Sequence, residues 1–170
     1  MKQSKVDRLL LGASIGGFAV LAISFLLMPV EELGFVPGIL FWGGLIIGAA
    51  LQIMLETRRR SLFAKYNVNR KTMQKPRNGL LSFASNRIAA IGDGLLAVSA
   101  VVTVAAFILT KGTGYLCYAG LSMLVFFFCM HCIFNGRNYI YVKNQTKIRQ
   151  VLEQKKANSS NKGEGKNEKN

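Results

Sequence analysis

The sequence is poor in acidic side chains, cysteine and histidine. Eight Asp and Glu accompany 22 Lys and Arg, which leaves a formal net charge of +14. Three cysteines and one histidine supply no disulfide framework of the kind that holds small secreted domains together. The sequence also lacks a glycine-rich phosphate loop, a Ser/His/Asp set and paired catalytic carboxylates. We therefore predict no catalytic residues and no cofactor.

Long apolar runs dominate what remains, since 51% of the residues are hydrophobic. An apolar helix of about 20 residues crosses a hydrocarbon core of about 30 Å. The sequence predicts an all-α polytopic membrane protein whose transmembrane helices form two antiparallel hairpins in a domain over residues 1–142. The four expected spans lie at about 9–28, 37–55, 88–109 and 115–134.

The basic residues indicate how this chain crosses the membrane. All Lys and Arg except Lys111 fall in the N-terminus, in residues 56–87 or after Asn135. Basic loops stay on the cytoplasmic side, so we expect both termini and a basic loop at 56–87 to be cytoplasmic. The tail, 143–170, is expected to be basic and cytoplasmic too, with a short surface helix to Lys156 and disorder from about 157.

Anionic lipid headgroups are the expected partner of this positive charge, because the charges avoid the apolar runs. The same clustering argues against nucleic acid. Apolar residues interleave with the basic ones in 56–87, which fits either a segment lying on the bilayer or a solvated loop. A membrane-protein partner and a homo-oligomer are the other expected contacts. The predicted headgroup or partner contacts are Arg58, Arg59, Arg60, Lys65, Arg70 and Lys71.

Small residues at four-residue spacing occur in both helices of the first hairpin. Gly12 and Gly16 form one such pair, and Gly44 and Gly48 form another. In lipid, close backbone approach over glycine drives helix packing. We expect these four glycines to pack the hairpin together, with homodimerisation as the alternative.

One acidic residue lies inside an expected span. Asp93 is six residues inward from Arg87, and the only histidine, His131, is six residues inward from Arg137. Antiparallel neighbours would place the two side chains at similar depth. Such a pair fits a proton-sensitive switch or an ion ligand. It also fits a structural hydrogen bond, or an Asp93 close enough to the interface to stay hydrated.

A Cys-x-x-Cys pattern, Cys129 and Cys132, puts both sulfurs on one face of the fourth span. Such pairs serve in thiol–disulfide exchange or metal binding. Here the expected orientation places them toward the cytoplasm, and only Cys117 remains to assist them. We favour buried packing thiols over redox or metal chemistry.

The run from Met130 to Tyr139, with residues 78–83 and Asp93, resembles uncharacterised small four-helix membrane proteins of Firmicutes-type bacteria. The resemblance covers roughly residues 75–143. It implies a bacterial cell-membrane protein and supplies no reaction. It adds emphasis to His131, Asn135, Gly136, Asn138 and Tyr139.

Three functions are consistent with these patterns. The first is a non-enzymatic accessory or regulatory protein of the cell membrane. The second is a small oligomeric transporter or channel that uses Asp93 and His131. The third is a membrane thiol oxidoreductase that uses Cys129 and Cys132.

Overall fold

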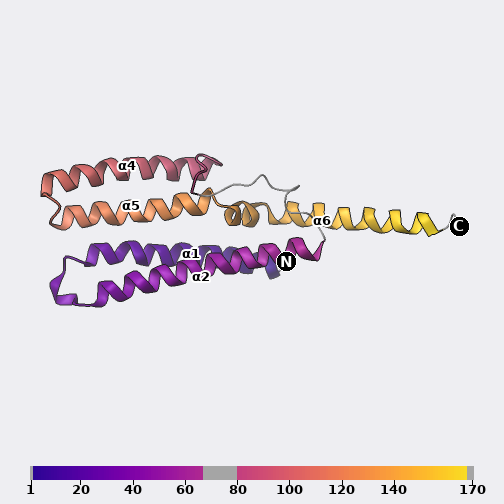
Figure 1. Cartoon of the computed structure of the whole chain (residues 1–170), viewed down its shortest axis with the longest axis horizontal. Coiled ribbons are helices and arrows are strands. Elements are labelled where there is room, and N and C mark those ends of the chain that lie inside the picture. Colours follow the sequence, from indigo (N-terminus) through magenta and orange to yellow (C-terminus); the bar gives the residue numbers. More distant parts are fainter. Residues whose placement is uncertain (1, 67–79, 168–170) are drawn as a thin grey trace.

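The computed structural model describes residues 2–66 and 80–167, with side chains described for 4–66 and 80–154. Within these residues all regular structure is helical, so the predicted all-α fold is confirmed. The elements follow one another along the chain (Figure 1) as α1 (Lys2–Leu27), η1 (Glu31–Leu33), α2 (Val36–Lys65), α4 (Arg87–Thr110), α5 (Tyr115–Phe134) and α6 (Arg137–Asn167).

Four of these helices, α1, α2, α4 and α5, are long and apolar enough to cross a membrane. Even α5, with 20 residues, reaches about 30 Å at 1.5 Å per residue. Helix α4 is apolar on its exposed side as well, where Val101 and Leu109 are 70% and 77% exposed. Helices that are apolar all round belong to a membrane or to the core of a large protein. These features are those of a membrane protein.

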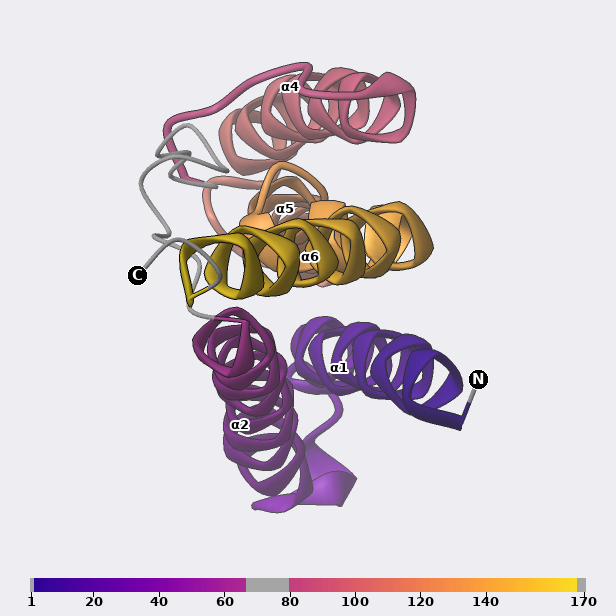
Figure 2. The same ribbon diagram turned by 90° about the vertical axis from the view of Figure 1, so that its right-hand side faces the viewer.

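The four helices form two antiparallel hairpins with their turns at one end (Figure 1). Helix α1 packs on α2, α4 packs on α5, and α5 also packs on α1. The result is a row in the order α4, α5, α1, α2 (Figure 2). Helix α6 lies at the opposite end from the turns and contacts α1, α2 and α5. Both termini lie toward that end (Figure 1).

Glycine brings the two helices of the first hairpin together, but through a different residue of α1 than expected. A Cβ on Gly44 would lie 2.5 Å from the backbone nitrogen of Leu21, and one on Gly17 would lie 2.8 Å from that of Gly48. By contrast, a Cβ on Gly12 or Gly16 would meet nothing within 4 Å. In this structure the close approach of α1 to α2 occurs at Gly17, Gly44 and Gly48, and Gly12 and Gly16 take no part in it.

The helical period explains this difference. The buried positions of α1 recur at three- and four-residue steps, namely Asp7, Leu11, Ser14, Gly17, Leu21 and Ser24. Gly12 and Gly16 lie off this face because each residue turns the helix by about 100°. The homodimer alternative for the outward pair stays a prediction.

Hydroxyl groups add a polar bond at each contact between spans. Ser14 Oγ donates to the Gly48 carbonyl at 3.0 Å within the first hairpin. Thr103 Oγ1 donates to the Gly120 carbonyl at 2.8 Å within the second. Ser122 Oγ on α5 donates to the carbonyl of Ala22 on α1 at 2.7 Å. Hydroxyl bonds of this kind fix the register of helices that meet in lipid.

Residues 56–65, expected to belong to a loop, form the last part of α2. Glu56 accepts from Arg59 and Arg60, three and four residues later, and such pairs support a helix. Phe63 is buried at 3% exposure and fixes this extension to the fold. Of the remaining expected loop, Tyr66 and 80–86 are described, and Arg87 is the first residue of α4.

The helical tail also differs from expectation, since α6 starts at Arg137 and continues to Asn167, past the predicted onset of disorder at 157. Gly136 separates it from α5. A Cβ there would lie 2.8 Å from the carbonyl oxygen of Cys132. Glycine therefore permits the tight break that turns α6 across the end of the spans.

Candidate functional site

The first polar group, the Asp93 cluster, consists of Asp93, His131, Asn135 and the segment 80–86. The Nδ1 atom of His131 lies 2.6 Å from Asp93 Oδ1. Asn135 Nδ2 donates to the same oxygen at 2.9 Å. The side chain of His131 is 2% exposed and that of Asp93 is 11% exposed. The structure thus brings together the two residues that the sequence placed at similar depth.

The segment 80–86 closes the Asp93 cluster from the loop side. The backbone N–H of Ala84 donates to Asp93 Oδ2 at 2.6 Å, and that of Ser85 donates to Asn135 Oδ1 at 3.1 Å. Asn86 then caps α4 by accepting from the N–H groups of Ile88 and Ala89. This segment therefore fastens the start of α4 to the end of α5.

Aromatic and backbone groups complete the surroundings of His131. The Phe83 ring centroid lies 4.7 Å from that of the imidazole. The carbonyl oxygen of Leu80 lies 3.4 Å from Nε2. Because an ionised carboxylate only accepts hydrogen bonds, Nδ1 of His131 is the donor to Asp93. The arrangement can hold the segment 80–86 against α4 and α5.

The cysteines make no disulfide. Cys129 and Cys132 are half-buried, Cys117 is buried, and all three thiols are free. In 2–66 and 80–167, no group of three or more His, Cys, Asp or Glu side chains is placed to hold a metal ion. Cys129 packs against the hydrophobic core at the α5–α6 end. These thiols therefore contribute packing surface in this structure.

The second polar group, the Asp7 cluster, consists of Asp7, Arg58, Tyr141 and Gln145. Asp7 is 1% exposed. Its carboxylate accepts from Arg58 Nε at 2.5 Å, from the Tyr141 hydroxyl at 3.1 Å and from Gln145 Nε2. Asp7 belongs to α1, Arg58 to α2, and the other two to α6. One carboxylate thereby joins three helices.

Sequence reasoning missed Asp7 because it treated residues 1–8 as a polar lead-in. The signal was present: Leu11 follows four residues later and Ser14 seven residues later, on the same helical face. The partners Tyr141 and Gln145 stand one turn apart on α6. Burial, then the charge and hydrogen bond of Asp7, raise the pKa of the Tyr141 phenol. The phenol therefore stays a proton donor to the carboxylate.

The residues expected to contact lipid headgroups differ in exposure. Arg58 is turned inward to Asp7, and Arg59, at 6% exposure, is paired with Glu56. Arg60 shares Glu56 but has a side chain that is 58% exposed. Lys65 is exposed. The two further predicted contacts, Arg70 and Lys71, lie outside the described residues.

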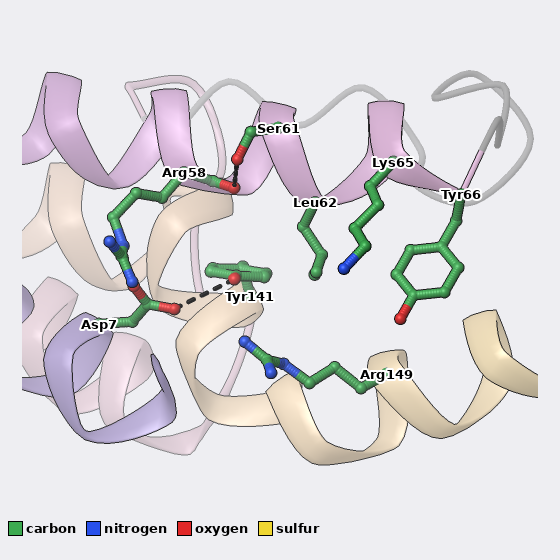
Figure 3. A pocket seen from close by; sticks show the side chains of 8 residues that line it. All are labelled: Asp7, Arg58, Ser61, Leu62, Lys65, Tyr66, Tyr141 and Arg149. Carbon is green, nitrogen blue, oxygen red and sulfur yellow. Dashed lines mark hydrogen bonds and ion pairs between the residues drawn. The ribbon is translucent and has the colours of Figure 1, made fainter. Parts of the chain in front are cut away.

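A cavity of about 300 Å³ lies between the end of α2 and α6, beside the Asp7 cluster (Figure 3). Its lining consists of Asp7 from α1, Tyr141 and Arg149 from α6, Tyr66 just after α2, and four residues of α2, namely Arg58, Ser61, Leu62 and Lys65. Asp7 lies at one end of it (Figure 3). The lining is thus mainly polar, with three basic residues and one acidic residue.

The chain matches no protein-family model, no curated protein and no solved structure. Its function is therefore argued from the geometry and charge of these two clusters and the cavity.

Proposed function

We propose that this chain is a non-enzymatic accessory protein of a bacterial cell membrane. Four spans anchor it, both termini are cytoplasmic, and its basic end contacts anionic lipid and a membrane-protein partner. The distribution of Lys and Arg supports this orientation, because the only basic residue in the two hairpin turns is Lys111. The resemblance of residues 75–143 to bacterial membrane proteins supports the choice of membrane.

One observation carries the proposal: the basic end is a folded platform built from helices. Helix α2 runs on to Lys65, and α6 packs across α1, α2 and α5. The buried polar groups bond to one another and hold these elements together. These buried hydrogen bonds fix the helices that carry the exposed basic residues. A basic surface of fixed shape suits recognition of a protein partner or of anionic lipid.

The transporter alternative depends on Asp93 and His131. Their bonds run to each other, to Asn135 and to the backbone of Ala84. These partners join α4, α5 and the preceding segment, which favours a structural fastening over an ion path. The redox alternative depends on Cys129 and Cys132, and their packing favours structural thiols.

The partner contact is tested with the exposed cations of the platform. Arg60→Gln combined with Lys147→Gln removes two positive charges while leaving the Arg58–Asp7 and Arg59–Glu56 pairs intact. Affinity purification of the full chain in a mild detergent should recover a membrane protein, and this double variant should lose it. Lys111→Gln, at the opposite end, is the control and should retain it. Equal recovery with all three proteins would contradict the proposal.

Orientation is tested separately. An alkaline phosphatase fused after Asn170 should be inactive in whole cells, because the enzyme needs an oxidising compartment. The same enzyme inserted after Gly112, in the turn between α4 and α5, should be active. The reverse pattern would overturn the proposed topology.

A further inference from the structure

We infer that the cavity between α2 and α6 is a binding site for a phosphate group. This inference deepens the proposed function and rests on its topology for one of two possible ligand sources. The cavity, at about 300 Å³, is at the small end of the range for ligand pockets, about 300–1,000 Å³. It has room for a phosphate with a small polar substituent.

Helical spacing aims the polar side chains at this cavity from two sides. On α2, Arg58, Ser61 and Lys65 stand at positions i, i+3 and i+7, which is one face. On α6, Tyr141 and Arg149 stand eight residues apart, again on one face. Figure 3 shows Lys65 pointing from α2 toward α6, with Arg149 on the facing helix.

The charge of the lining is positive. Arg58, Lys65 and Arg149 contribute three positive charges, and Asp7 contributes one negative charge, which leaves +2. Asp7 is already bonded to Arg58, Tyr141 and Gln145. The ion pairs within the described residues include none for Lys65.

The donor types favour phosphate over a carboxylate. A phosphate offers three or four acceptor oxygens in a tetrahedral arrangement, so it can bond to donors on both helices at once. The cavity supplies an ammonium from Lys65, a guanidinium from Arg149 and a hydroxyl from Tyr66. Arginine and lysine bind phosphate in complementary ways, one through a planar fork and the other as a point charge.

The location allows two sources of this phosphate. The cavity is lined by residues at the end of α2 and by α6, and α6 lies at the end opposite the hairpin turns (Figure 1). In the proposed topology this is the cytoplasmic headgroup region, where an anionic phospholipid would reach it. A soluble phosphorylated compound would reach the same site from the cytoplasm.

Calorimetric titration of the full chain in dodecyl maltoside, a detergent without phosphate, tests the site. The first probe is sodium phosphate, titrated against sodium chloride at equal ionic strength. The second is dihexanoyl-phosphatidylglycerol below its micelle concentration, with dihexanoylglycerol as the phosphate-free control. Saturable binding of both phosphate probes is expected for a site that recognises phosphate itself. Binding of phosphatidylglycerol alone assigns the site to a lipid headgroup.

Paired variants locate the binding. Lys65→Gln combined with Arg149→Gln should weaken it at least about tenfold, since charge-assisted hydrogen bonds are lost. Arg60→Gln combined with Lys147→Gln removes the same charge from the same two helices outside the cavity and should change affinity less than about twofold. Lys65→Gln alone alters one exposed side chain, preserves the fold and should weaken binding about threefold or more.

Two results would overturn this inference. One is that neither phosphate probe binds the wild-type chain. The other is that the cavity and control double variants lose affinity equally, which would indicate general surface charge. If the wild-type chain recovers no membrane partner while phosphate binding is intact, the result would count against the proposed function alone. Failure of phosphate binding with the partner retained would count against this site alone.

Discussion

The two hairpins close their ends in the same way with different chemistry. In the first, Asp7 on α1 pairs with Arg58 on α2 and with two side chains of α6. In the second, Asp93 on α4 pairs with His131 on α5 and with the backbone of Ala84. Each carboxylate therefore joins its own hairpin to a third element. The first uses a guanidinium as the partner of the carboxylate, and the second uses an imidazole.

This difference separates two kinds of fastening. Asp7 accepts from both Arg58 and Tyr141, so it attaches α6 to the first hairpin through side chains. The Asp93 cluster instead attaches the segment 80–86, through the backbone N–H groups of Ala84 and Ser85.

The largest effect is expected at Asp7. Asp7→Leu removes the acceptor for Arg58, Tyr141 and Gln145, and losing three hydrogen bonds to a buried carboxylate should cost about 3 kcal/mol of unfolding free energy. Thermal unfolding in detergent, followed with a thiol-reactive dye, measures the loss as buried Cys117 becomes accessible. Glu153→Gln, an exposed acid on α6, should leave the curve unchanged. An Asp7→Leu curve equal to wild type would refute the role of this cluster.

Glycine packing in the first hairpin is the next target. Gly44→Ala places a Cβ 2.5 Å from the backbone of Leu21 and should cost about 2 kcal/mol through overpacking. Gly12→Ala meets nothing within 4 Å and should be neutral or stabilise by up to about 1 kcal/mol. The same thermal assay compares the two. If Gly12→Ala proved the more harmful, an outward contact such as self-association would explain it.

Much of this fold follows from the sequence, because a 20-residue apolar run has few alternatives to a membrane helix. The hydrogen bonds between polar residues at the ends of the helices are harder to predict from the sequence. Asp7 and Gln145 are 138 residues apart, and nothing local to either reveals the pairing. The Gly12 and Gly16 spacing matches a packing motif, but the buried face of α1 is set by its partner helices. Asp93 and His131 were predictable because a short turn fixes the relative depth of antiparallel neighbours.

A double-mutant cycle on Asp93→Asn and His131→Gln tests the Asp93 cluster. We expect a coupling energy of about 1–2 kcal/mol, because Nδ1 of His131 lies 2.6 Å from Asp93 Oδ1. The matched cycle on Asp7→Asn and Arg58→Gln tests the Asp7 cluster in the same thermal assay. A coupling near zero in either cycle would contradict the role of that pair in closing its hairpin.

The smallest effect concerns the backbone of the segment 80–86. Ala84 has a φ of +48°, in the left-handed region that costs a residue with a Cβ about 1 kcal/mol. Ala84→Gly should therefore stabilise the fold by about 0.5 kcal/mol after the entropy of glycine in the unfolded chain is subtracted. Ala90→Gly, at an exposed helical position of α4, should instead destabilise by about 1 kcal/mol. Changes in unfolding free energy of opposite sign for Ala84→Gly and Ala90→Gly would show that the backbone at Ala84 is strained in the folded protein. Destabilisation by both substitutions would contradict this strain.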